Sequence, residues 1–319
     1  MATNRLCKWR LAIILPGIWI CFLTGSVHAQ LTSIAAIAGM DRSENTGVPG
    51  QGGRPEIPAY VLDETPRGVL YRFFRQGEWY FSWGGSRQAW APSDFHISQP
   101  FQGNNFTIYN VRGVDDPSWG GLLAGQYNIR FGRFVDEART LAIEFNFDHT
   151  KYDVREGQTA RVAGAIAGKP IDANFQLDNI FRYQLHNGAN HAMFNLVKRI
   201  PLIGETNETF SVAAIGKIGA GIVVPHAANT ILGNANDVGK KEFNNLIGTN
   251  RGWWQINGWT AGVEFGFRVV LAQPIYLEIT DKIAFAQLSN VPVFQGTARH
   301  QLWMNEVIVS VGITFGGGR

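Results

Sequence analysis

Cysteine, charge and long apolar runs are all scarce in this sequence. Only two of the 319 residues are cysteine, and only 17% are charged, well below the roughly 25% that is typical of soluble domains. After the first thirty residues no run of about 20 apolar residues occurs, which excludes a bundle of membrane-spanning helices. The aromatic content of 12% excludes a disordered chain.

The N-terminus predicts a cleaved signal peptide over residues 1–29. Three basic residues precede an apolar stretch at 11–23, and small residues at 25–29 offer a cleavage site before Gln30. Both cysteines, Cys7 and Cys21, lie within this segment. The expected mature chain therefore has no cysteine, and disulfides do not hold it together.

Loss of the signal peptide changes the charge balance. Without its three basic residues, the 28 Lys and Arg fall to 25, which equals the 25 Asp and Glu. Nucleic acid is therefore excluded as a partner, because its binding needs a basic footprint. The sequence also has no helical His/Glu pair and no exported cysteine that would bind zinc. The glycine-rich segment 216–221 looks superficially like a nucleotide-binding loop, but it lies in a strand pattern with no helix after it. We expect no metal and no cofactor.

The mature chain divides into two regions of different composition. Residues 30–66 are rich in glycine and proline, which predicts a flexible periplasmic tail. From residue 67 to 319, apolar and polar residues alternate with period two, most clearly in 141–148, 259–271 and 306–315. This pattern predicts β-strands, and several reach 13–17 residues, far longer than the usual strand of a globular sheet.

Two all-β folds fit this alternation. A secreted β-sandwich or lipocalin-like barrel would bury the apolar face, whereas a membrane barrel would turn it toward lipid. Strand length favours the membrane barrel, as do aromatic residues near strand ends, which can form interfacial girdles; they are Trp79, Trp83, Tyr152, Tyr183, Trp253, Trp254 and Trp303. The fold expected is a transmembrane antiparallel up-and-down β-barrel, closed because lipid cannot satisfy an open sheet edge.

Seven stretches between about residue 78 and residue 315 resemble an uncharacterised group of bacterial outer-membrane β-barrel proteins. The resemblance implies an outer-membrane location and a barrel fold, and it implies no activity. The stretches are 80–84, 93–96, 106–109, 143–152, 187–190, 219–225 and 262–268.

Loop lengths predict the number of strands, because such barrels have short periplasmic turns and longer outer loops. We assign 136–138, 168–171, 201–208 and 272–274 to periplasmic turns. The resulting barrel has about twelve strands, within a range of 10 to 14, and includes strands near 78–88, 104–113 and 126–135. Its least regular strands are 68–75 and 161–167.

Histidines near the predicted outer rim raise the possibility of an enzyme. A lipid A esterase or phospholipase needs a nucleophile, a base and a group that orients the base. Two combinations fit these roles: Asp148 and His149 with Ser93, or Ser289 with His300. The alternative, which we favour, is that rim histidines make ordinary interfacial hydrogen bonds.

The long loop 226–254 is a candidate for contact with lipid. Its basic and aromatic residues would meet the phosphates and upper acyl chains of lipopolysaccharide or other outer-membrane lipids. These residues are Lys240, Lys241, Arg251, Trp253 and Trp254. A mobile solvated loop explains the same residues. During insertion the expected partner is the barrel assembly machinery.

The strands 255–271 and 274–290 predict a hairpin with ion pairs on its inner face. If residue 273 is the centre of the turn, Arg268 faces Glu278 and Glu264 faces Lys282. Alternation also turns inward Arg130, Glu144, Asp148, Arg182, Lys217 and Glu306. Five acidic and five basic residues would then cross-link a lumen that is filled by side chains. We expect a structural, binding or small-solute passage role, with a narrow passive channel or an outer-leaflet hydrolase as alternatives.

Overall fold

The computed structural model describes residues 77–115, 125–185, 188–204, 209–236 and 254–316. The chain divides into two compact units, residues 1–61 and 62–319, and every described residue belongs to the second. The described residues form seventeen strands and two short 3-10 turns, and none of their helices is long and apolar enough to span a membrane. The predicted signal peptide and glycine-rich tail lie outside this part of the chain.

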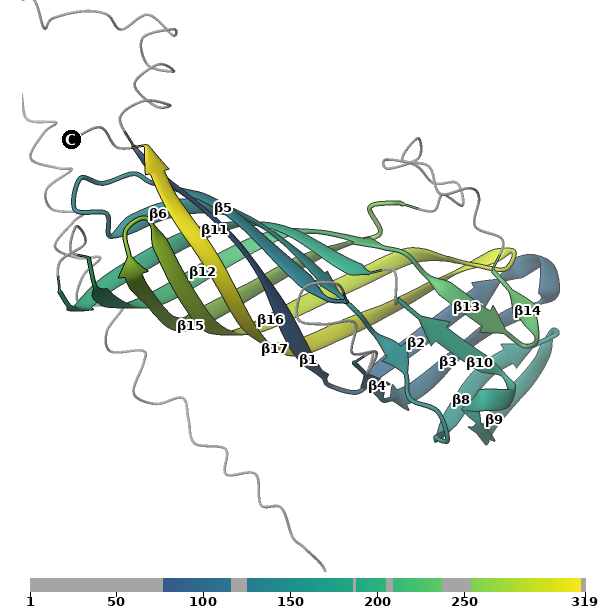
Figure 1. The fold of residues 1–319 in the computed structure, drawn as a ribbon. Coiled ribbons are helices and arrows are strands. Elements are labelled where there is room, and N and C mark those ends of the chain that lie inside the picture. Colours follow the sequence, from purple (N-terminus) through teal and green to yellow (C-terminus); the bar gives the residue numbers. More distant parts are fainter. Residues whose placement is uncertain (1–76, 116–124, 186–187, 205–208, 237–253, 317–319) are drawn as a thin grey trace, which may run out of the picture. The chain divides into compact units, whose positions relative to one another are not determined.

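Eight antiparallel strands close into a barrel (Figure 1). Each strand pairs with the next in the ring, and the last pairs with the first from Glu78 opposite Gly316 to Trp90 opposite Met304. In ring order the strands are β1 (Glu78–Trp90), β5 (Tyr127–Phe134), β6 (Leu141–Thr150), β11 (Ala189–Ile203), β12 (Ser211–Pro225), β15 (Gly258–Ala272), β16 (Ile275–Val293) and β17 (Gly296–Gly316).

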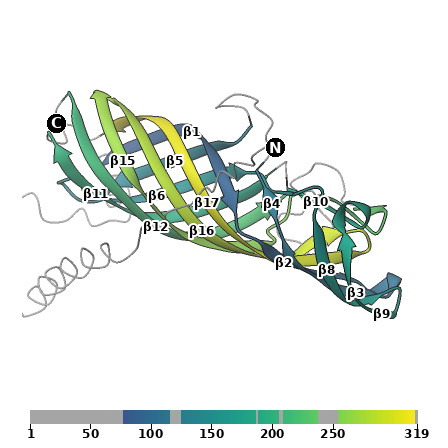
Figure 2. The same ribbon diagram turned by 90° about the horizontal axis from the view of Figure 1, so that it is seen from below.

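The two ends of the barrel differ. At one end, which we call the turn end, lie the short connections β5–β6, β11–β12 and β15–β16, together with the start of β1 and the end of β17. These three connections are the turns predicted around residues 136–138, 201–208 and 272–274. At the opposite end, which we call the cap end, the connections β1–β5, β6–β11 and β12–β15 carry additional strands, whereas β16–β17 is a two-residue turn (Figure 2).

The cap consists of two small sheets that enclose an apolar core. One sheet extends β17 through β2 (Ser93–Gln99), β3 (Asn104–Val111), β8 (Thr159–Ile166) and β9 (Lys169–Gln176). The second contains β4 (Gly113–Val114), β7 (Asp153–Val154), β10 (Phe181–Gln184), β13 (Ala228–Ile231) and β14 (Asn234–Ala235). The turns η1 (Pro100–Gln102) and η2 (Leu177–Asn179) complete it. Phe95, Ile108, Tyr152, Tyr183 and Leu288 are fully buried between the sheets.

The strand count of the barrel needs a correction. The large sheet has twelve strands, but only eight of them close into the ring. The predicted strands 104–113 and 161–167 belong to the cap, and 168–171 includes the start of β9, not a turn of the barrel. The β8–β9 turn lies beside the β2–β3 turn, where the amide of Gly168 donates to the carbonyl of Gly103 at 2.9 Å. Cap strands alternate like barrel strands because one face packs on a core. The predicted strand 68–75 lies outside the described residues.

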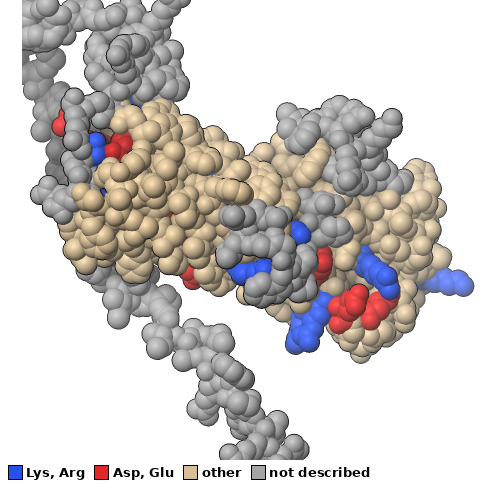
Figure 3. Space-filling view, in the orientation of Figure 1, with Lys and Arg blue, Asp and Glu red and all other residues tan. Residues whose placement is uncertain are grey.

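The outer wall of the barrel is apolar around the whole ring. Every strand of the ring contributes exposed, large apolar side chains that point outward, among them Phe81, Phe131, Ile143, Phe194, Ile218, Phe265, Ile279 and Val309. On the face drawn in Figure 3, charged side chains gather on the cap and at the turn end, and the wall between them is largely uncharged. A soluble barrel would bury such a surface, whereas lipid stabilises it.

Candidate functional site

The barrel interior is filled in layers. Next to the turn end a small apolar cluster closes the lumen; its members are Tyr80, Phe134, Ala142, Val197, Ile215, Val270 and Tyr276. At the other end lies the apolar core of the cap. Between them is a charged layer of nine side chains, each at most 3% exposed: Arg130, Glu144, Asp148, Lys217, Glu264, Arg268, Glu278, Lys282 and Glu306.

Arg268 and Glu278 form an ion pair across the β15–β16 hairpin. Their Cα atoms are directly opposite in the register. The Nε and Nη2 atoms of Arg268 lie 2.8 and 2.7 Å from Oε2 of Glu278. The guanidinium carbon is also 4.5 Å from the ring centre of Tyr80 and 4.2 Å from that of Tyr276, so two aromatic faces stabilise the same cation.

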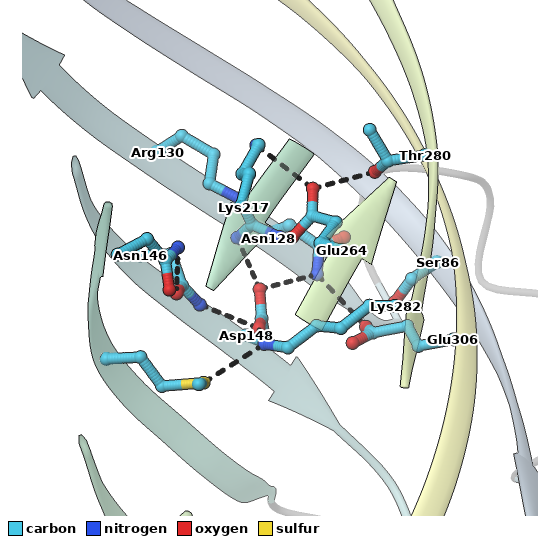
Figure 4. A network of polar contacts seen from close by, with 12 residues as sticks. Ser86, Asn128, Arg130, Asn146, Asp148, Lys217, Glu264, Thr280, Lys282 and Glu306 are labelled. Atoms are coloured by element: carbon cyan, nitrogen blue, oxygen red, sulfur yellow. Dashed lines mark hydrogen bonds and ion pairs between the residues drawn. The ribbon is translucent and has the colours of Figure 1, made fainter. Parts of the chain in front are cut away.

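Glu264 and Lys282 are also opposite in the register, but their side chains pair with other residues. Glu264 Oε1 lies 2.9 Å from the Lys217 ammonium. The Lys282 ammonium donates to Asp148 from β6 (Figure 4). Register therefore determined which residues share a level of the barrel, and contacts across the lumen determined the partners.

Lys217 and Arg130 connect the carboxylates into one network. The Lys217 ammonium lies 3.3 Å from Glu144 and 2.7 Å from Glu278. The Arg130 guanidinium pairs with Asp148 and lies 3.7 Å from Glu144 and 3.5 Å from Glu264. Because each cation contacts two or more carboxylates, the layer joins β5, β6, β12, β15 and β16 through the middle of the barrel.

Amide and hydroxyl side chains complete the network. Gln88 and Asn128 donate to Glu306 Oε1 at 3.0 and 3.1 Å, and Thr280 donates to Glu264 at 2.8 Å. The sequence analysis considered only charged residues and therefore missed these uncharged groups, although their inward positions follow from the same alternation. Arg182 is an error of the sequence prediction: it is exposed on β10 of the cap, because that segment is not a barrel strand.

Two glycines make room for the tyrosines of the interior. Tyr80 is opposite Gly132, and Tyr276 is opposite Gly312. A Cβ atom on either glycine would lie 2.2 Å from a carbon of the tyrosine ring. The absence of a side chain leaves space for each ring over the neighbouring strand, and the hydroxyl of Tyr80 thereby reaches past β5 and donates to Glu144 of β6 at 3.0 Å.

The proposed catalytic combinations are not assembled. Asp148 points into the lumen, whereas His149, the next residue on β6, lies on the outer face with its Nδ1 2.6 Å from the Asn190 Oδ1. Ser289 is exposed and His300 is buried. Ser93 is buried in β2 of the cap. Among these five described residues, no hydrogen bond joins one to another.

His300 is part of the cap core. It lies beyond Trp303 on β17, on the side of the cap, and its ring stacks on Phe95 at 4.1 Å. Its Nε2 lies 2.9 Å from the hydroxyl of Tyr183. Burial lowers the pKa of His300 to about 3, since desolvation disfavours the charged imidazolium. A neutral, packed histidine of this kind is structural.

Most of the predicted lipid-contact residues fall in a segment that the structure does not describe. Lys240, Lys241, Arg251 and Trp253 lie outside the described residues. Trp254 is described, and the centre of its ring is 5.9 Å from that of His226.

Comparison with known proteins gives only structural similarity. No protein-family model and no curated protein matches the chain. The chain is similar to outer-membrane β-barrel proteins of solved structure. Ail, the attachment invasion locus protein of Yersinia pestis, is 12% identical with a TM-score of 0.29, and the match covers 75% of this chain and 99% of Ail. Neisserial surface protein A is 9% identical with a TM-score of 0.32, over 75% of this chain and 100% of that one. OprG from Pseudomonas aeruginosa is 9% identical with a TM-score of 0.32, over 76% and 97%.

Proposed function

We propose that this protein is a non-conducting barrel of the bacterial outer membrane that supports the cap as a binding surface outside the cell. The apolar wall supports the membrane location. The short connections of the turn end and the long excursions of the cap end support an orientation with the turn end in the periplasm, because outer-membrane barrels have short periplasmic turns and long outer loops.

The burial of the charged layer carries the proposal that the barrel does not conduct. In a water-filled pore, inward charged side chains line the channel and remain accessible to solvent. Here all nine are at most 3% exposed, and apolar clusters lie on both sides of them. This arrangement of the described residues supports an interior closed to solutes, so a binding or structural role fits better than passage.

Conductance measurements test this proposal. Purified protein, shown to be folded by heat-modifiable migration on gels, would be inserted into planar bilayers beside a general porin as the positive control. We expect no discrete current steps from this protein at voltages where the porin conducts. Reproducible steps would contradict a closed interior.

The cap offers an apolar contact point for a partner. Phe101, in η1 at the β2–β3 turn, is 90% exposed, the highest value among the exposed large apolar side chains of the described residues. Aromatic side chains at such protruding positions are frequent anchors of protein interfaces. A partner that binds the cell surface would therefore contact this turn.

Cysteine labelling tests the orientation. With Cys7 and Cys21 replaced by serine, the chain has no other cysteine, so single substitutions report one site each. We expect Phe101→Cys to react with a membrane-impermeant maleimide on intact cells. Glu137→Cys, in the exposed β5–β6 turn, should react only after the outer membrane is permeabilised. The reverse pattern would contradict the proposed orientation.

Contact between the loop 226–254 and lipopolysaccharide belongs to the same proposal. Lys240, Lys241 and Arg251 would bind lipid phosphates at the outer surface. Reversing the three charges should weaken the association of the purified protein with lipopolysaccharide, and unchanged association would show that the loop does not carry it.

A further inference from the structure

A polar pair interrupts the apolar outer wall of the barrel. Asp281 on β16 and Asn305 on β17 both point outward and are exposed. The side-chain amide of Asn305 donates to Oδ1 of Asp281 at 2.6 Å. The two residues are therefore at the same depth in the wall.

The pair lies within the apolar region, between Trp303 and Val307 on β17. Along β16, the outward residues toward the turn end are Ile275, Leu277 and Ile279, and those toward the cap are Ile283 and Phe285. On β15, Phe265 is opposite Asp281 in the register.

Other outward polar residues on the described barrel strands lie closer to the ends of the apolar wall. Arg87 lies toward the cap end, and Lys198 lies toward the turn end. Gln287 and Gln301 lie on the cap side of Phe285 and Trp303.

Lipid alone is a poor environment for this pair. A carboxylate on the lipid face of a barrel is destabilising by an amount that grows with depth. The bond between the two side chains leaves one N–H and the side-chain oxygen of Asn305, and one oxygen of Asp281, available. Acyl chains offer neither donor nor acceptor to these atoms, so a protein partner that supplies both would stabilise the wall.

We propose that the wall formed by β16 and β17 binds a second copy of this chain within the membrane. Two copies inserted in the same direction can form a symmetric dimer only about an axis along the membrane normal, and residues at equal depth then meet. The free N–H of Asn305 would donate to Asp281 of the partner subunit, and the reciprocal bond would form by symmetry.

The chemistry of the pair favours a second copy over an unrelated protein. Each copy contributes a free donor and free acceptors at one depth, so the set is self-complementary. The side chains around the pair are apolar and exposed, and they would pack against the same residues of the other copy. They are Phe267, Ile279, Ile283, Val307 and Val309. This proposal does not depend on conduction or on the cap.

Site-specific cross-linking in native membranes tests the dimer. In a Cys7→Ser, Cys21→Ser background, Ile283→Cys places one thiol beside the polar pair. Leu196→Cys on β11 is the matched control, because it is on the far side of the ring and is 51% exposed against 49% for Ile283. With a short bis-maleimide reagent we expect at least tenfold more product of twice the monomer mass from Ile283→Cys.

Changes to the polar pair separate hydrogen bonding from general apolar contact. Asp281→Leu with Asn305→Leu makes the wall uniformly apolar, so the barrel should still fold and show heat-modifiable migration, but the cross-linked product should fall to the level of the Leu196→Cys control. Asp281→Asn keeps hydrogen-bonding groups and should retain the product. Equal cross-linking of Ile283→Cys and Leu196→Cys would overturn the proposal, as would full cross-linking of the double-leucine variant. A product with the mass of a different protein would also overturn it.

Discussion

Replacement of Arg268 by methionine should destabilise the barrel, because it leaves Glu278 buried with only part of its compensating charge. Oε2 of Glu278 loses two charge-assisted hydrogen bonds, at 2.8 and 2.7 Å, while Oε1 keeps the Lys217 ammonium at 2.7 Å. Removal of one partner of a buried pair typically costs about 3–5 kcal/mol. The remaining Lys217 contact places the expected loss near the lower limit, about 3 kcal/mol in the free energy of unfolding.

A double-mutant cycle isolates the pair. Glu278→Gln should cost a similar amount because Arg268 then lacks its carboxylate. The double variant Arg268→Met, Glu278→Gln buries neither charge, so it should be at least about 2 kcal/mol more stable than the sum of the single losses predicts, within the range known for contacting residues. Lys198→Met, an exposed turn-end lysine that donates to Thr140, should cost less than about 1 kcal/mol.

Urea unfolding in lipid vesicles, followed by tryptophan fluorescence, measures these differences; the full chain has ten tryptophans. Additive losses in the double variant would refute the reasoning, because they would show that the two buried side chains do not interact. Losses below about 1 kcal/mol in both single variants would refute it too, since they would mean that water reaches the charged layer.

Two further predictions concern the barrel packing and the cap. Gly132→Ala should cost about 1–3 kcal/mol, because its Cβ would overlap the ring of Tyr80; Gly216→Ala, whose Cβ would meet only Phe265 at 3.7 Å, should cost much less in the same unfolding assay. The pKa of folded His300 is about 3, whereas that of an unfolded histidine is about 6.5. Between these pH values the unfolded chain binds more protons than the folded chain. The free energy of unfolding should therefore fall as the pH drops from 6.5 toward 3, by as much as about 1.4 kcal/mol per pH unit. His300→Gln should remove this part of the pH dependence, as measured by proteolysis of the cap at pH 7.5 and 4.5, and an unchanged pH dependence would show that His300 is not buried.

Within the hairpin of β15 and β16, the sequence by itself determined which residues face the interior. A strand turns successive side chains to opposite faces, so the alternation in 259–271 is sufficient to place Glu264 and Arg268 inside and Phe265 and Phe267 outside. The short β15–β16 turn also determined the register, because only one pairing brings Arg268 opposite Glu278 while keeping both apolar faces outward. These are local properties of one hairpin, and local sequence is sufficient for them.

The tertiary structure decided how many strands close and which charges meet. Cap strands such as 104–111 and 159–166 alternate like barrel strands, since both kinds have one face on a core, so the pattern could not separate a ring of eight from a ring of twelve. The partners of Lys282 and Lys217 come from β6 and from other strands across the lumen. Such contacts depend on the diameter and stagger of the closed barrel, which are properties of the whole ring and of no single segment of the chain.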